Sequence, residues 1–205
     1  MRAYYFSIFM KYAIIILVAA FVVACSGGDS TEGDQLFNDG EYIEAIEAYN
    51  RHLEENPATI KTLYNRGRAY EEIGEYNKAL MDFNKILEKD ERNINAMLSI
   101  SKVKYEQRNY SQALLWAEKV LKLNESSAQA HFLIGRSKHQ LGYAASALES
   151  YSLAIKINRD FGEAYLYRGA LKISLEKKGS ACEDLRKARN LEVEGSKEAL
   201  SKYCK

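Results

Sequence analysis

Proline is almost absent from the sequence, with Pro57 alone among 205 residues. Because proline breaks a helix interior, this scarcity favours helical segments along the whole chain. Catalytic motifs are missing as well: no glycine-rich phosphate loop, no Gly-x-Ser-x-Gly nucleophile motif and no Cys-x-x-Cys pair occurs. These absences argue against an enzyme and against a bound cofactor.

Histidine is also scarce, with only His52, His131 and His139. The last two are eight residues apart, and on a helix this spacing is about 12 Å, too far for both to ligate one metal ion. No metal site is therefore predicted.

Charge of one sign is not in excess, since the formal net charge is +1. The two ends nevertheless differ: residues 25–57 hold nine acidic residues and one basic residue, and residues 58–205 hold 26 basic and 19 acidic residues. No continuous basic face is indicated, which argues against nucleic-acid binding. The asymmetry favours a chain with an acidic and a basic end.

The longest apolar run, residues 12–24, has 13 residues and follows Lys11. It is too short to cross a hydrocarbon core of about 30 Å, but it suits the apolar part of an export signal. One alternative is an uncleaved helix that begins near Tyr4 and ends at a core cysteine. Translation could also begin at Met10, since the signal is complete from there.

The end of this run, Val22-Val23-Ala24-Cys25, resembles the lipobox of bacterial lipoproteins. The resemblance implies cleavage before Cys25 and lipidation of that residue. Several acyl chains on one residue give a durable membrane anchor, at about 0.8 kcal/mol for each buried CH₂. The expected location is the bacterial cell envelope, with the outer membrane as the first expectation.

Three columns of residues recur every 34 residues without an insertion. The first column is small: Gly33, Gly67, Ser101, Gly135 and Gly169. The second is alanine throughout: Ala45, Ala79, Ala113, Ala147 and Ala181. The third is mainly aromatic or large: Tyr49, Phe83, Ala117, Tyr151 and Leu185. Such a period indicates a stack of equal structural units.

These columns resemble those of the tetratricopeptide repeat. The resemblance implies an all-α fold: a right-handed superhelix (α-solenoid) of five helix-turn-helix repeats, with a C-terminal capping helix. The expected parts are a signal peptide (1–24), a linker (25–28), repeats 29–59, 60–93, 94–127, 128–161 and 162–194, and the cap (195–205). Acidic residues at packing positions in the first repeat predict that its first helix is short and solvated.

Two further cysteines stand near the C-terminus, where an exported chain can form disulfides. If the last two helices pack as an antiparallel hairpin, Cys182 and Cys204 come together. A disulfide over this loop would stabilise the fold by roughly 3 kcal/mol. Two independent thiols are the alternative.

The resemblance also implies a concave surface, lined by the first helix of each repeat, that binds another protein. Nine residues are predicted to line it: Tyr64, Asn65, Arg68, Leu98, Lys102, Tyr105, Phe132, Arg136 and His139. An apolar row lies beside a basic row there, which suits a peptide with apolar and acidic side chains. Alternatively, the basic residues are only solvated and the apolar ones only pack.

The predicted function is a lipid-anchored adaptor that binds an unidentified protein at the cell envelope and has no enzymatic activity. One alternative is self-association, in which the acidic first repeat of one copy docks on the basic repeats of another. A second alternative is a cell-wall saccharide binder that uses the tyrosines.

Overall fold

The computed structural model describes residues 28–204, and within that range every regular element is a helix. The helices are α2 (Gly28–Asp39), α3 (Tyr42–Glu55), α4 (Ile60–Glu72), α5 (Tyr76–Lys89), α6 (Ile94–Glu106), α7 (Tyr110–Leu123), α8 (Ala128–Gln140), α9 (Ala144–Ile157), α10 (Gly162–Ser174), α11 (Lys178–Asn190) and α12 (Ser196–Tyr203). The prediction of an all-α solenoid of helix-turn-helix repeats is confirmed. The predicted export signal, its linker and Cys25 lie outside the described residues or at their edge.

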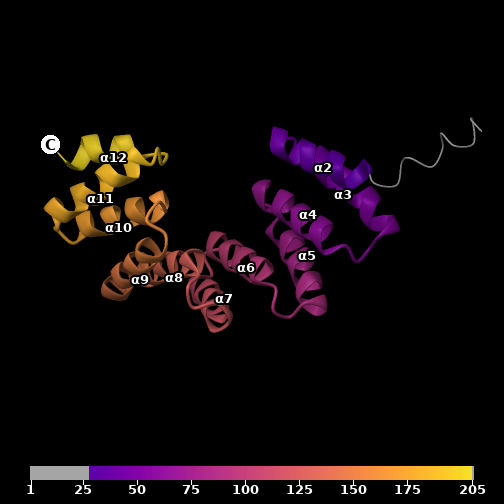
Figure 1. Cartoon of the computed structure of the whole chain (residues 1–205), viewed down its shortest axis with the longest axis horizontal. Coiled ribbons are helices and arrows are strands. Elements are labelled where there is room, and N and C mark those ends of the chain that lie inside the picture. Colours follow the sequence, from indigo (N-terminus) through magenta and orange to yellow (C-terminus); the bar gives the residue numbers. More distant parts are fainter. Residues whose placement is uncertain (1–27, 205) are drawn as a thin grey trace, which may run out of the picture. The chain divides into compact units, whose positions relative to one another are not determined.

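The structure divides into two units, which are described separately: the first contains α2 to α4 and the second α5 to α12. In the first unit α3 packs against both α2 and α4. In the second, each helix from α6 onward packs on the one before it, and α6 also contacts α8, α8 contacts α10 and α10 contacts α12 (Figure 1).

The resemblance to the tetratricopeptide repeat, with its 34-residue period, predicts where the first helix of each later repeat begins. These helices begin at Ile60, Ile94, Ala128 and Gly162. Two of the starts are capped by a side chain: Asn93 accepts a hydrogen bond from the Ala96 N–H, and Ser127 accepts one from the Ala130 N–H. Such caps satisfy backbone donors that a helix leaves unpaired at its start.

The first helix, α2, is not short, and this part of the prediction is wrong. It has 12 residues, against 13 in α4. Packing explains its length, because the ring of Tyr49 on α3 lies directly against Gly33 of α2. Acidic residues in this helix do not prevent the contact.

The turn inside each repeat uses the left-handed backbone conformation that favours glycine. Gly40, Gly74 and Gly142 adopt it, with φ of 83°, 77° and 83°. In the third and fifth repeats the same position holds Arg108 and Glu176, with φ of 60° and 59°. The fold therefore imposes this turn whether or not glycine is present.

The predicted disulfide is confirmed. Cys182 lies near the start of α11 and Cys204 directly follows α12, with their Cα atoms 5.6 Å apart. The bond ties the last helix, α12, to α11.

Candidate functional site

The nine residues predicted to line the binding surface all lie on the first helices of repeats. Tyr64, Asn65 and Arg68 are on α4 in the first unit. The other six are on α6 and α8 in the second unit: Leu98, Lys102, Tyr105, Phe132, Arg136 and His139.

In the first unit a carboxylate joins all three helices. Asp34 of α2 accepts hydrogen bonds from the Tyr49 hydroxyl (2.9 Å) and from the Asn65 amide (2.7 Å). Its second oxygen pairs with the Lys61 ammonium at 2.7 Å. We call Asp34, Tyr49, Lys61 and Asn65 the Asp34 site.

The donors around Asp34 set its ionisation. Burial alone would raise the pKa of Asp34, but hydrogen bonds from Lys61, Tyr49 and Asn65 together hold it below the ordinary value of 3.8. Burial, and then the Asp34 carboxylate, raise the pKa of the Tyr49 hydroxyl well above its usual range. The site is an ionised carboxylate with its donors already in place. The Asn65 amide donates to Asp34 rather than facing a ligand.

Beside this site lies a pocket of about 220 Å³, lined by Asp34, Phe37, Asn38, Tyr49, Asn65 and Arg68. Arg68 is exposed, and its guanidinium carbon lies 4.6 Å from the centre of the Phe37 ring. An aromatic face holds the cation by its quadrupole while leaving the N–H groups open. Arg68 therefore presents a positioned positive charge at the rim of the pocket.

In the second unit Arg136 lies among aromatic rings. Its guanidinium carbon is 3.9 Å from the centre of the Tyr105 ring and 5.2 Å from that of Tyr167. Its side chain is only 14% exposed, and one terminal nitrogen lies 3.5 Å from a Glu106 carboxylate oxygen. Among residues 28–204, no partner is found for its Nε. The cation is thus fixed in place with hydrogen-bonding capacity unused.

Phe132 does not line an accessible surface, so this part of the prediction is wrong. It is 2% exposed, and its ring lies 4.8 Å from Phe161, 5.5 Å from Tyr167 and 6.0 Å from Tyr151, measured between ring centres. Aromatic residues from the end of the fourth repeat and from the fifth bury it. Leu98 is also partly buried, against the core around Met97.

The remaining predicted residues differ in character. Lys102 is exposed on α6. His139 is half-buried on α8, and burial lowers the pKa of its imidazole below 6.5. A neutral ring at pH 7 contributes packing and hydrogen bonding rather than charge.

Sequence reasoning missed two residues of this site, Tyr151 on α9 and Tyr167 on α10. Tyr151 is fully buried, with its ring centre 6.4 Å from that of Tyr167. Burial raises the pKa of the Tyr151 hydroxyl well above its usual range. We call Tyr105, Phe132, Arg136, Tyr151 and Tyr167 the Arg136 site. The sequence could have indicated Tyr151, because it stands in the same 34-residue column as Tyr49.

Family models of the tetratricopeptide repeat match residues 60–93 and 98–162. This chain is a tetratricopeptide repeat protein. No curated protein sequence matches it. Tetratricopeptide repeat proteins are typically non-enzymatic scaffolds that bind other proteins.

Solved structures share the tetratricopeptide repeat fold. A thermophilic repeat protein from Thermus thermophilus, TTC0263, has a TM-score of 0.70 and 22% identity, over 86% of this chain and 95% of that one. MamA from Desulfovibrio magneticus has a TM-score of 0.68 and 19% identity, over 82% and 97%. YrrB, described as having an unusual peptide-binding site, has a TM-score of 0.58 and 21% identity, over 80% and 84%.

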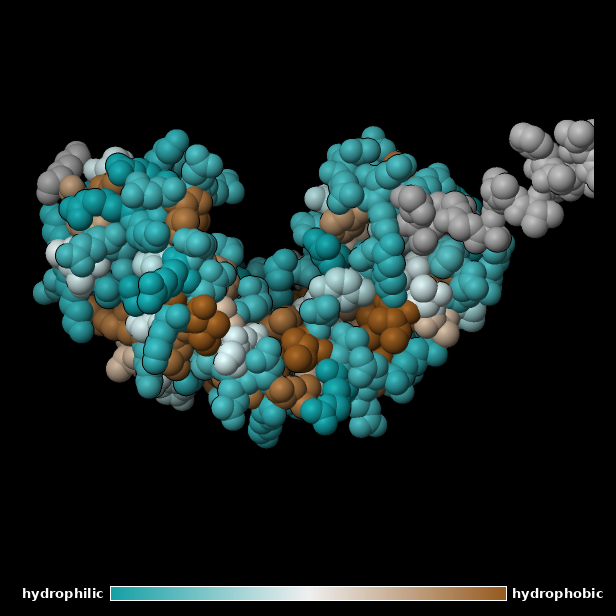
Figure 2. Space-filling view, viewed as in Figure 1, coloured by the Kyte–Doolittle hydropathy of each residue, from teal (hydrophilic) through white to brown (hydrophobic). Residues whose placement is uncertain are grey.

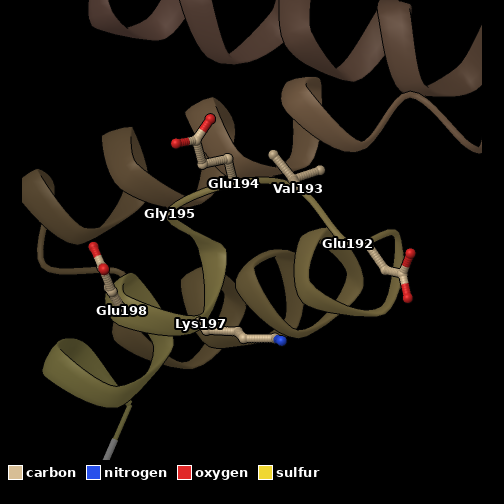
Figure 3. A pocket seen from close by; sticks show the side chains of 6 residues that line it. All are labelled: Glu192, Val193, Glu194, Gly195, Lys197 and Glu198. Atoms are coloured by element: carbon tan, nitrogen blue, oxygen red, sulfur yellow. The ribbon is translucent and has the colours of Figure 1, made fainter.

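At the C-terminal end of this tetratricopeptide repeat protein lies an acidic pocket of about 270 Å³. It is lined by Glu192, Val193, Glu194, Gly195, Lys197 and Glu198. In Figure 3 the three carboxylates point in different directions rather than toward one centre. Between residues 28 and 204, no group of three potential ligands is placed to hold a metal ion.

None of the helices from α2 to α12 has both the length and the apolarity that crossing a bilayer requires.

Proposed function

We propose that this chain is a lipid-anchored adaptor of the bacterial cell envelope, which binds a peptide segment of another protein on the first helices of its repeats. The observation that carries the proposal is Arg136, held at 3.9 Å from the Tyr105 ring with its Nε unpaired within the described chain. Fixed, partly desolvated arginines with aromatic neighbours are typical of the residues that dominate binding energy.

The surface supports recognition by polar contacts. The face drawn in Figure 2 is mostly hydrophilic, with separate hydrophobic patches. A partner would therefore be held by positioned charges and a few apolar anchors rather than by one large apolar area.

Charge reversal tests the binding surface. The double variant Arg68→Glu with Arg136→Glu should lose capture of envelope proteins, because it replaces two cations by anions. A matched control, Lys85→Glu with Lys156→Glu, makes the same change of charge at exposed positions on α5 and α9. Equal capture by both double variants would contradict the proposal.

Cys25→Ala tests the anchor, because the lipid cannot attach to alanine. We expect the variant to leave the membrane fraction when cells are fractionated, while the parent chain stays in it. An unchanged distribution would remove the anchor from the proposal.

Self-association is a second candidate, supported by the excess of acidic residues in 25–57 and of basic residues in 58–205. Surface charges are screened by salt, so light scattering should report a larger particle at about 20 mM salt than at about 0.5 M. A monomer at both concentrations would exclude this candidate.

A further inference from the structure

Two tyrosines at equivalent places in the repeats have different surroundings. Tyr49 and Tyr151 stand three 34-residue periods apart, and each ring packs directly against the small residue of its repeat, Gly33 or Gly135. In the first repeat the tyrosine hydroxyl donates to the Asp34 carboxylate. Three periods after Asp34 the chain has Arg136 instead.

This replacement leaves two donors of the Arg136 site without an acceptor among the described residues. Within the described chain, the buried Tyr151 hydroxyl and the Arg136 Nε both have no hydrogen-bond partner. An unmade hydrogen bond at a buried polar group is costly, and most such groups are paired. Glu106 does not fill the gap, because it reaches only a terminal nitrogen of Arg136, at 3.5 Å.

The Asp34 site shows what is missing. There a carboxylate sits against the tyrosine hydroxyl and also accepts a hydrogen bond from Asn65. Three periods after Asn65 stands Tyr167, whose ring lies 5.2 Å from the Arg136 guanidinium carbon. We propose that the Arg136 site binds one carboxylate side chain of a partner peptide, which accepts hydrogen bonds from Arg136 and Tyr151 as Asp34 accepts one from Tyr49 in the first repeat.

The surface beside the Arg136 site limits which residues can flank the acidic residue of the peptide. A hollow of about 440 Å³ adjoins Tyr167, lined by Glu163, Leu166, Tyr167, Val193, Glu194 and Gly195. Glu163 stands three periods after Lys61, the residue that pairs with Asp34. A second acid beside the first would therefore be repelled, whereas an apolar or basic neighbour would be accepted. The ligand is a peptide with a single acidic residue among apolar and basic ones.

This inference rests on the proposed peptide binding, and selection from a library of random twelve-residue displayed peptides tests both. The full chain should enrich peptides with one Asp or Glu at a fixed distance from an apolar residue. Enrichment of peptides without acidic residues would overturn the carboxylate inference and leave the proposed function standing. Enrichment of no peptide would overturn both.

A selected peptide and its Glu→Gln form then give the energetics by fluorescence anisotropy. Since hydrogen bonds to charged groups are the strong ones, the Gln form should bind roughly ten to a hundred times more weakly to the parent chain. For the Arg136→Asp variant the two forms should bind equally weakly. Its melting temperature should fall, because the aspartate loses the ring contacts of Arg136 and faces Glu163, which stands in place of the lysine that pairs with Asp34. The Tyr151→Phe variant described next therefore separates binding from folding. If the Glu→Gln change in the peptide lowers its affinity for the parent chain and for the Arg136→Asp variant by the same factor, the inference is overturned.

Two further variants separate binding from folding. Tyr151→Phe removes an unpaired hydroxyl, so it should weaken binding of the acidic peptide several-fold without lowering the melting temperature. Glu163→Lys recreates the lysine of the Asp34 site and should tighten binding of the acidic peptide several-fold. Unchanged affinity in both variants would show that the carboxylate binds elsewhere.

Discussion

The Tyr49 hydroxyl donates a 2.9 Å hydrogen bond to the Asp34 carboxylate and so connects α3 to α2. Lys61 and Asn65 of α4 complete the contact. One ionised side chain therefore holds the three helices of the first unit together, and its protonation should loosen all three.

The stability of the first unit should depend on the ionisation of Asp34. Because the pKa of Asp34 is below 3.8 in the folded chain, the unfolded chain takes up a proton first as the pH falls. The contribution of Asp34 is therefore complete well above pH 3.8 and is lost as the pH falls through the folded value. NMR titration of the carboxyl carbon should show this low pKa, and Asn65→Ala should raise it. A pKa at or above 3.8 in the parent chain would contradict the prediction.

Close packing of tyrosine on glycine should make Gly135→Ala destabilising. A Cβ at this position would lie 2.6 Å from a Tyr151 ring carbon. Overpacking of this kind costs about 1–3 kcal/mol, measured as a lower free energy of unfolding in urea.

Gly179→Ala is the matched control for this variant. Nothing lies within 4 Å of its added Cβ, and Gly179 is in α11. Alanine is the better helix former, so this change should stabilise the chain by up to about 1 kcal/mol. Equal effects of both changes would show that the contact with Tyr151 carries no energy.

Replacing a non-glycine residue in a left-handed turn by glycine should stabilise the fold. Arg108 has φ of 60° at the position where other repeats have glycine. A residue with a side chain pays about 1–2 kcal/mol to adopt this conformation, and glycine does not. Glycine, however, loses more conformational entropy on folding. Arg108→Gly should therefore raise the free energy of unfolding by up to about 1 kcal/mol. The reverse change, Gly142→Ala, should lower it by about the same amount, although nothing lies within 4 Å of the added Cβ.

The 34-residue period predicted the length of the repeats, because equal units stack with equal lengths. The resemblance to the tetratricopeptide repeat then set the helix starts at Ile60, Ile94, Ala128 and Gly162. The left-handed conformation of Arg108 and Glu176 could not be predicted in this way, since the packed helices on either side impose it.

The candidate site was less predictable, because exposure depends on neighbouring repeats. Phe132 stands at a position that faces the binding surface in the family pattern, yet Phe161 and Tyr167 cover it. Asn65 was expected to face a ligand, but Asp34, 31 residues earlier, takes its amide. Both outcomes depend on side chains that meet only after the repeats have packed.

The disulfide between Cys182 and Cys204 should contribute to the stability of the C-terminal end. It closes a loop with a sequence separation of 22, and in the chain-entropy model such a loop stabilises by roughly 3 kcal/mol. Cys204→Ser should lower the free energy of unfolding by about this amount. Amide exchange should become faster first in α12, because that helix has only α10 and α11 as neighbours among the described helices.

Reduction of the parent chain provides the control. Treatment with dithiothreitol should reproduce the faster exchange in α12, while the Cys204→Ser variant should not respond to it. Exchange in α8 should change little in either case, because α8 is packed among α6, α7, α9 and α10. If the oxidised parent chain and the variant unfold at the same urea concentration, the bond adds no stability, and α12 is held by packing on α10 and α11 alone.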